Sequence, residues 1–516
     1  MFINDFKNFG VTSASSSQKR PAGYAFLTEK YQLAVIPNWH ISYIGENESF
    51  WYVIQENQVE ETYPAAYWQG EDDAAQLQFA LQHDTVNPGI LSALFEVIPQ
   101  ETLLQCVREY CKEDWCRVLW FLYEFLTGKQ LELLDLTEGE EIPVLDPGLF
   151  YTLAPGEFVP RQRVLNNLTG DAAFCPLIRR TDKLAEMEKK NLQARCEEVV
   201  KSYPPDLLKR ALTYLHKKET RSSFEIEHIQ PDNSRTGKFV TLLERAEQTD
   251  FCRKEQLIEI QNQVVDERFR DSDYRTDQNY VGQSISHRRE IIHYICPKPE
   301  DLPMLMEGLL HTHQMMKNGS LHPVVHAAAV AFAFVFMHPF NDGNGRIHRF
   351  LINNILSQSH FIPSGITFPI SAAMLKDPKL YDQALEAFSK PLIKITQYTL
   401  DAMGRMTVHN ETARWYRYVD MTVQTEALFE FIARTIEDEL VEELDFLNQY
   451  DKTKEKLQSV VDMPDQLVDL FIRLCGQNGG RLSSKKRKDH FSFLSDEELT
   501  RMESIVQEGY RFDPSL

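Results

Sequence analysis

The spacing of apolar positions changes along the chain and predicts a mixed region followed by helices. Near the start, residues 24–37 (YAFLTEKYQLAVIP) and 50–55 (FWYVIQ) have the aromatic and β-branched content of strands. From about residue 73 to residue 133 the apolar residues recur at helical spacing, for example in RVLWFLYEFLTG. This order predicts a small mixed α/β domain.

Prolines and glycines interrupt residues 138–181, which predicts an irregular connector with short strands. Helical periodicity then resumes and dominates to the end of the chain. The exception is YVGQSISHRREIIHYICPKP (280–299), where polar and apolar residues alternate around a turn and predict a β-hairpin. The apolar run 323–337 is shorter than the roughly 20 residues of a membrane-spanning helix, so we expect a buried central helix.

Composition narrows the class of protein. A chain of 516 residues is too long for one core and predicts several domains. The net charge of −21 disfavours nonspecific binding to nucleic acid or to an anionic membrane. No signal peptide is recognisable in MFINDFKNFGVTSASSSQKR, and the eight cysteines lack metal-site spacing, so we expect a cytoplasmic protein with reduced thiols and no membrane partner.

The candidate chemistry is concentrated in HPFNDGNGRIHR, from His338 to Arg349. Its two glycines allow a tight turn close to a ligand, and the helical pattern that follows places a helix N-terminus there, where unpaired N–H groups attract phosphate. Arg346 and Arg349 share one helix face and can clamp phosphate oxygens. Asp342 is a candidate ligand for Mg²⁺, and His338 can accept a proton near neutral pH.

This stretch resembles the Fic family signature, His-Pro-Phe-x-Asp/Glu-Gly-Asn-Gly-Arg-x-x-Arg, at every specified position. Weaker resemblance to large Fic proteins extends from about residue 220 to the end. The resemblance implies an all-helical core that transfers AMP from ATP to a hydroxyl side chain of a target protein. In that reading His338 is the general base toward a Ser, Thr or Tyr hydroxyl, and Asp342 holds Mg²⁺.

The resemblance also implies roles for the other motif residues. The phosphate chain of ATP would be bound by Gly343, Asn344, Gly345, Arg346 and Arg349, with Arg349 taking the γ-phosphate. The predicted hairpin would be a flap that binds an extended segment of the target as an added strand and so aligns its backbone. The flap residues named on this basis are Gly282, Gln283, Ile292 and Tyr294.

A second segment, TRSSFEIEHI, resembles the inhibitory pattern Ser/Thr-x-x-x-Glu-Gly/Asn of Fic proteins with an N-terminal inhibitory helix. Ser223 and Glu227 are expected to share a helix face, from which Glu227 would pair with Arg349 and occupy the γ-phosphate position. The chain departs from the pattern at His228, where Gly or Asn is usual.

Other functions stay open at this stage. A metal-dependent phosphohydrolase is the alternative enzyme, because His311 with His313, and His322 with His326, have spacings at which imidazoles can share a metal. Removal of AMP by the same site is a second alternative, and a nucleotide-switched scaffold is a third. Nucleic acid is an improbable partner overall, although a basic run near the C-terminus could contact it: Arg481, Lys485, Lys486, Arg487 and Lys488.

We therefore expect a mainly α protein with an all-helical Fic core and a β-hairpin flap. The expected parts are a mixed α/β N-terminal domain with its connector at 1–180, a helical segment with the inhibitory helix at 181–235, the Fic core at 236–402 and a helical C-terminal domain at 403–516. The expected activity is adenylylation by ATP with Mg²⁺, held down by Glu227. The resemblance makes a homodimer a reasonable expectation, and the target protein is left open.

Overall fold

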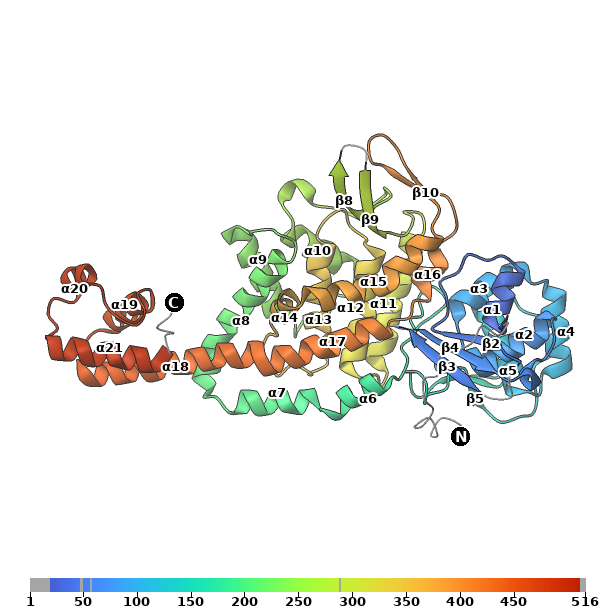
Figure 1. The fold of residues 1–516 in the computed structure, drawn as a ribbon, viewed down its shortest axis with the longest axis horizontal. Helices are drawn as coiled ribbons and strands as arrows, with labels where there is room; N and C mark the ends of the chain where they lie inside the picture. The colour runs from blue at the N-terminus through green and yellow to red at the C-terminus, as the bar shows by residue number, and fades with distance from the viewer. Residues whose placement is uncertain (1–18, 47–49, 56–57, 287–288, 511–516) are drawn as a thin grey trace. The chain divides into compact units, whose positions relative to one another are not determined.

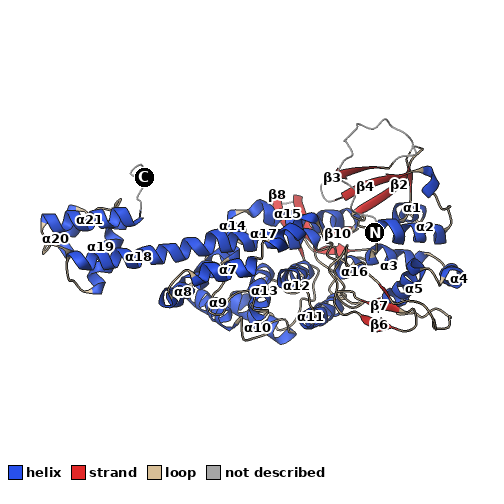
Figure 2. Cartoon of the chain, turned by 90° about the horizontal axis from the view of Figure 1, so that it is seen from below, coloured by secondary structure: helices blue, strands red, loops and turns tan. Residues whose placement is uncertain are grey.

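The computed structural model of the chain describes residues 19–46, 50–55, 58–286 and 289–510 (Figure 1). Contacts divide the chain into two compact units. The first unit comprises Met1–Glu186, Phe251–Ile352 and Lys379–Leu428, and the second comprises Met187–Asp250, Asn353–Pro378 and Phe429–Leu516. Helices dominate the described chain and strands form only small sheets (Figure 2), which confirms the mainly α prediction. The four-part division drawn from the sequence stays a prediction.

The first unit begins with a four-stranded sheet and five helices. The strand order is β1-β2-β4-β3, and the β2–β4 pair is parallel. Its strands are β1 (Arg20–Pro21), β2 (His40–Ile44), β3 (Trp51–Gln55) and β4 (Gln58–Tyr63). Its helices are α1 (Tyr24–Lys30), α2 (Asp73–Phe79), α3 (Pro88–Val97), α4 (Gln100–Tyr110) and α5 (Asp114–Thr127), with a 3-10 turn η1 (Ala65–Tyr67) and a π turn η2 (Ala80–Asp84). The mixed α/β character is confirmed.

One predicted strand is wrong. Residues 24–30 form α1, and residues 33–37 belong to neither helix nor strand. Tyr24 and Leu27 are the buried residues of α1, and their spacing of three places both on one helix face. Aromatic content favoured a strand, but a short apolar run cannot be assigned by content alone. The second predicted strand, at 50–55, is confirmed by β3.

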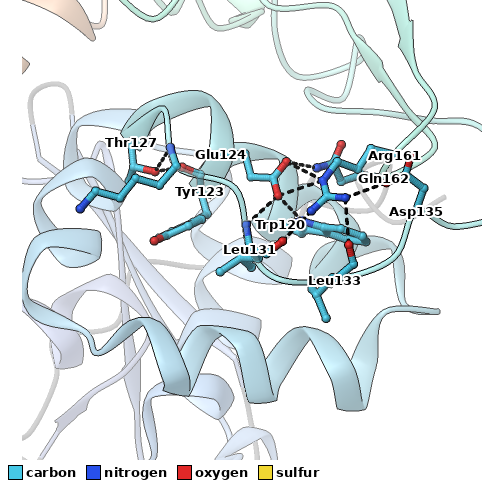
Figure 3. Close-up of polar contacts among 10 residues, drawn as sticks. Trp120, Tyr123, Glu124, Thr127, Leu131, Leu133, Asp135, Arg161 and Gln162 are labelled. Carbon is cyan, nitrogen blue, oxygen red and sulfur yellow. Dashed lines mark hydrogen bonds and ion pairs between the residues drawn. The ribbon is translucent and has the colours of Figure 1, made fainter.

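The connector contains the short strands predicted for it, which pair in the order β5-β7-β6: β5 (Ile142–Pro143), β6 (Glu157–Val159) and β7 (Val164–Asn166). The carboxylate of Glu124, on α5, accepts several hydrogen bonds that attach the connector to this helix (Figure 3). Glu124 Oε1 accepts from Trp120 Nε1 at 2.8 Å, and Oε2 accepts from Arg161 Nε at 3.0 Å and from Gln162 Nε2 at 2.7 Å. Arg161 also donates to the Leu133 carbonyl at 3.0 Å, so the irregular backbone is tied to a regular helix.

The remainder of the first unit is mainly helical and includes α12 (Pro323–Met337), which is almost entirely buried, as predicted. Among the described residues, no single helix is both long and apolar enough to cross a bilayer, and only the sharply bent pair α3–α4 passes by length and composition together. The other elements are α10 (Lys254–Val264), η3 (Glu267–Phe269), β8 (Tyr280–Ser286), β9 (Arg289–Ile295), α11 (Leu302–Asn318), α13 (Asn344–Gln358), α15 (Pro378–Ile395), β10 (Tyr398–Leu400), β11 (Met406–Val408), α16 (Ala413–Arg417) and α17 (Thr422–Arg434). Of these, α13, α15 and α17 continue across the boundary between the units.

The second unit is helical throughout. After α6 (Asp182–Lys189), which spans the boundary, it contains α7 (Leu192–Lys201), α8 (Pro205–Glu225), α9 (Asn233–Arg245), α14 (Ile370–Lys376), the π turn η4 (Thr435–Glu439), α18 (Leu440–Val460), α19 (Asp465–Gly476), α20 (Ser484–His490) and α21 (Asp496–Tyr510). Helix α8 packs against α9, α14 and α18. The last helices enclose an apolar core that includes Val468, Phe471, Phe491 and Met502.

Candidate active site

The predicted base lies where α12 ends. His338 has φ of 48° and closes the helix in the left-handed conformation, with its N–H donating to the Phe334 carbonyl at 3.0 Å. Its Nδ1 lies 3.1 Å from the carbonyl oxygen of Val335. Because a carbonyl oxygen can only accept, this contact places the proton of the neutral ring on Nδ1 and leaves the lone pair on Nε2. The half-buried imidazole therefore has the tautomer that a general base needs.

Residues 338–343 are here called the motif turn. The side chain of the next residue, Asn344, holds this turn. Asn344 Oδ1 accepts from Phe340 N at 3.0 Å, and its Nδ2 donates to the Phe340 carbonyl at 2.7 Å. Gly343 has φ of +92°, and a Cβ there would lie 2.9 Å from Val265 Cγ1. The glycine is needed for both backbone conformation and space, and the turn leads directly into α13.

Arg346 and Asp342 pair with each other beside this turn. Asp342 Oδ1 accepts from Arg346 Nη2 at 2.7 Å and from Gly343 N at 2.6 Å, while Arg346 Nη1 donates to the Val264 carbonyl at 2.6 Å. Arg346 is fully buried, whereas the Asp342 side chain is 44% exposed. In this arrangement Arg346 supports the turn and orients Asp342, and the phosphate contact predicted for it stays a prediction.

Asp342 has the donor expected of a Mg²⁺ ligand. Within the described residues its Oδ2 makes no hydrogen bond, and half-exposed carboxylate oxygens suit this hard cation, which keeps several waters. Gly345 is half-buried in the first turn of α13. Arg349 lies one turn further on and is almost completely buried. A buried guanidinium is costly to desolvate, so it is a candidate functional group as well as a structural one.

The predicted hairpin is confirmed as a structure. Strands β8 and β9 form a two-stranded antiparallel sheet, with Gly282 opposite Ile292. Gln283 is exposed and Ile292 is half-buried. Tyr294 differs from the other named flap residues because its side chain is buried and its hydroxyl donates to the Phe336 carbonyl. It anchors the hairpin to α12, and the flap role of the hairpin stays a prediction.

The predicted inhibitory segment closes α8. The helix ends at Glu225, so Glu227 lies in the closing turn rather than on the regular helix face expected from the sequence. His228 N donates to the Glu225 carbonyl at 2.9 Å, and Ile229 N donates to the Phe224 carbonyl at 3.1 Å. These two bonds form a Schellman motif with His228 as its left-handed residue, at φ of 56°.

The Schellman motif explains why the family pattern has Gly or Asn at position 228, since both residues adopt positive φ readily. Histidine is among the residues enriched there, so His228 preserves the backbone of the pattern. Glu227 is thus the last residue before the reversal and is half-buried, while Ser223 is fully buried one turn earlier.

Sequence reasoning missed three residues that hold the motif turn from outside it. Asp271 accepts from the backbone N of Asn341 at 3.0 Å and from its Nδ2 at 2.9 Å. Gln261 accepts from Asp271 N at 3.0 Å. Arg275 donates to the His338 carbonyl at 2.8 Å. No local sequence pattern marks these residues. Arg275 and Asp271 have their partners in the motif turn more than 60 positions further along the chain.

The histidines of the hydrolase alternative contact three different kinds of group: a backbone N–H, another histidine and a carboxylate. His322 Nδ1 accepts from Val324 N at 3.2 Å and caps α12. His326 Nε2 lies 3.0 Å from His313 Nδ1 in the interior. His311 Nδ1 contacts Asp171 at 2.5 Å on the surface. The i, i+4 pair His322–His326 is therefore divided between a helix cap and a core contact.

Comparison with known proteins agrees with this geometry. Residues 251–356 match the model of the Fic/DOC family. The protein named protein adenylyltransferase Fic from Drosophila mojavensis is 37% identical over 91 residues, which are 18% of this chain and 16% of that protein. Its namesake from Culex quinquefasciatus is 34% identical over 119 residues, or 22% of this chain and 21% of that protein. The match thus spans about a fifth or less of these curated relatives.

Two solved structures are also similar. A Fic family protein from Desulfovibrio desulfuricans G20 aligns over 64% of this chain and 90% of its own, with 18% identity and a TM-score of 0.35. A Fic domain containing signaling protein from Bacteroides thetaiotaomicron aligns over 50% of this chain and 94% of its own, with 17% identity and a TM-score of 0.34. The family match covers α10, the hairpin, α12, the motif turn and most of α13. This chain therefore carries a Fic domain at residues 251–356.

Proposed function

We propose that this protein transfers AMP from ATP to a hydroxyl group of a protein. The observation that carries the proposal is the 3.1 Å contact between His338 Nδ1 and the Val335 carbonyl, which leaves Nε2 as the basic nitrogen. The curated relatives named protein adenylyltransferase Fic support the class of reaction. The motif turn and the N-terminus of α13 supply N–H groups suited to a phosphate chain.

In the proposed reaction, Nε2 of His338 takes the proton of a Ser, Thr or Tyr hydroxyl. The hydroxyl oxygen forms a bond to the α-phosphorus of ATP, and the bond from that phosphorus to the oxygen bridging to the β-phosphate breaks. Pyrophosphate leaves with both electrons of the broken bond. Arg349 and the amides of Asn344 and Gly345 hold the phosphates, while Gly343, whose N–H bonds Asp342, shapes the turn beside them. The chain thus contributes mainly positioning and charge stabilisation.

Mg²⁺ would be held by Asp342, and when bound it would neutralise charge on the phosphate chain. The ion pair between the buried Arg346 and the partly exposed Asp342 fits this task, because it fixes Oδ1 while the side chain keeps access to solvent. The chain's own residues thus orient a single carboxylate, which agrees with the few protein ligands that Mg²⁺ usually takes.

We also propose that Glu227 inhibits this activity. The support is the resemblance of its segment to the Fic inhibitory pattern together with the Schellman motif, which preserves the backbone of that pattern at His228. Because the motif fixes the end of α8, Glu227 has a defined position rather than that of a fraying terminus. Glu227→Gly removes the carboxylate with the rest of the side chain and leaves the left-handed residue, His228, unchanged.

The experiment compares ATP labelled at the α-phosphate with ATP labelled at the γ-phosphate, using wild type and Glu227→Gly. Each is incubated with magnesium and a cell extract, and labelled proteins are identified by mass spectrometry. We expect α-label on protein with release of pyrophosphate, and more of it with Glu227→Gly. Kinases of the extract transfer γ-label themselves, so the decisive signal is the α-label. Protein that carries no more α-label than in extract without the added protein would contradict AMP transfer. Equal labelling by the two proteins would contradict inhibition by Glu227.

A further inference from the structure

Arg275 lies in the segment before β8 and is only 4% exposed. Its guanidinium donates to three backbone carbonyls: Nε to His338 at 2.8 Å, Nη1 to Asp277 at 2.7 Å and Nη2 to Pro297 at 2.7 Å. Its own N–H donates to the Pro339 carbonyl at 2.8 Å. Within the described residues, its side chain makes no ion pair with a carboxylate.

The three carbonyls belong to parts of the fold that must act together in the proposed reaction. His338 is the first residue of the motif turn and carries the candidate base. Asp277 precedes β8, which starts at Tyr280, and Pro297 follows β9, which ends at Ile295. One planar group therefore joins the base-bearing turn to both ends of the hairpin.

A guanidinium suits this junction better than any other side chain. Its five N–H donors lie in one rigid plane, so contacts to three acceptors fix both their distances and their relative angles. Burial lowers the pKa of Arg275, and a buried cation paired only with carbonyls is costly compared with an apolar residue. A hairpin needed only for stability could be joined to α12 by apolar packing.

Two other hydrogen bonds attach the hairpin to the rest of the unit without involving His338. Tyr294 donates to the Phe336 carbonyl, and Tyr416 donates to the Ile295 carbonyl at 2.7 Å. Both contacts hold β9, whereas neither reaches the backbone of the motif turn. Removal of Arg275 should therefore loosen the relation between the hairpin and His338 while the hairpin remains attached.

We propose that Arg275 is a positioning residue that holds the hairpin in register with the His338 imidazole. A target segment added to the hairpin edge then presents its hydroxyl at the distance that Nε2 requires. This proposal rests on the proposed AMP transfer, but the mechanical link between hairpin and turn is present without any substrate.

The test compares Arg275→Met and Arg275→Lys with Arg268→Met as the matched control. Arg268 lies in the same segment, is largely exposed and pairs with Asp266. Hydrogen exchange is followed for peptides covering residues 279–295 and 336–343 in the full chain without nucleotide. We expect about 10-fold faster exchange in both peptides for Arg275→Met, an intermediate effect for Arg275→Lys and none for the control.

Activity gives the second readout. A misplacement of about 1 Å can cost on the order of 100-fold in rate. In the Glu227→Gly background we therefore expect transfer by Arg275→Met to fall about 10- to 100-fold, while the ATP dissociation constant changes by less than about 2-fold.

Four outcomes would overturn the inference. The first is wild-type exchange in both peptides, and the second is faster exchange in only one of them. The third is a loss of ATP affinity that explains the whole fall in rate. The fourth is global unfolding of both Arg275 variants, because Arg275 would then serve the unit as a whole. If Glu227→Gly, which lacks the proposed inhibitory carboxylate, labels no protein but both peptides still exchange faster in Arg275→Met, the AMP transfer fails and the mechanical link stands.

Discussion

Asn344 holds Phe340 by both backbone groups, accepting from its N–H at 3.0 Å and donating to its carbonyl at 2.7 Å. Both residues are buried, so neither backbone group of Phe340 can turn to water instead. The asparagine of the signature is thus a brace for the turn as well as a candidate phosphate contact.

The first prediction concerns that brace. Asn344→Ala leaves a buried N–H and a buried carbonyl unpaired, which should lower the free energy of unfolding by about 2–4 kcal/mol. Asn341→Ala is the control. Within the described part of the chain, the exposed Asn341 side chain hydrogen-bonds Asp271, and its loss should cost less than about 1 kcal/mol. Urea unfolding of both variants measures the difference. Equal losses in the two would show that the brace has no special part in the turn.

The second prediction uses the backbone of Gly343. In Gly343→Ala the positive φ and the 2.9 Å approach to Val265 should together cost at least about 1–3 kcal/mol. For Gly237→Ala we expect the opposite sign, because Gly237 lies inside α9 with open space around it. The free energy of unfolding should rise by about 0.5–1 kcal/mol. Thermal unfolding reports both signs, and a stable Gly343→Ala would mean that the turn can relax without loss.

The third prediction is a dependence on pH in the N-terminal sheet. His40 Nε2 lies 2.9 Å from Glu61, and Nδ1 lies 3.5 Å from Asp84. Burial by itself lowers the pKa of His40, but hydrogen bonds and charge from Asp84 and Glu61 outweigh it and raise the pKa to about 9. A pKa raised from 6.5 gives stability that is complete below about pH 6.5 and lost as the pH rises through about 9.

Wild type should therefore lose more stability than His40→Gln between about pH 7 and pH 9.5, measured by urea unfolding at each pH. The variant lacks the titrating group but keeps all other alkaline titrations of the chain. Parallel losses in the two proteins would show that His40 is not held in its charged form.

The fourth prediction concerns the helix that carries the inhibitory segment. The buried Glu219 on α8 accepts from Ser371 N at 2.8 Å and from Ser371 Oγ at 2.6 Å, at the start of α14. Glu219→Ala should cost about 2–4 kcal/mol, because hydrogen bonds to a buried carboxylate are lost. Glu225→Ala, on the exposed end of the same helix, should change the free energy of unfolding by less than about 0.5 kcal/mol.

A double-mutant cycle with Ser371→Ala isolates the pair, and we expect a coupling of about 0.5–3 kcal/mol. Hydrogen exchange in peptides of α8 and α14 provides the measurement within the full chain. Strictly additive effects of the two substitutions would mean that Glu219 stabilises α8 by other contacts.

The sequence predicted the features that are encoded locally. The signature from His338 to Arg349, the buried helix at 323–337 and the hairpin at 280–295 each carry their pattern in adjacent residues, and the last two are confirmed as elements of the structure. The strand expected at 24–37 is wrong because its aromatic content was compatible with both a strand and a helix face.

The rest depended on contacts between distant residues. Arg275 is an ordinary arginine in a polar loop until folding brings His338 and Pro297 to its guanidinium. Glu219 reads as a solvated helix residue, yet it is buried against Ser371, 152 positions away. Spacing along the chain cannot reveal such partners, because the pairing is fixed by how helices pack.

Whether His338 is the general base is tested by the rate of AMP transfer of His338→Ala, made in the Glu227→Gly background and measured with α-labelled ATP. The control is His360→Ala, because His360 is exposed and also has positive φ, at 55°. We predict that His338→Ala abolishes labelling of protein while ATP binding, measured by calorimetry, is retained, and that His360→Ala labels at the background rate. Undiminished labelling by His338→Ala would contradict the account.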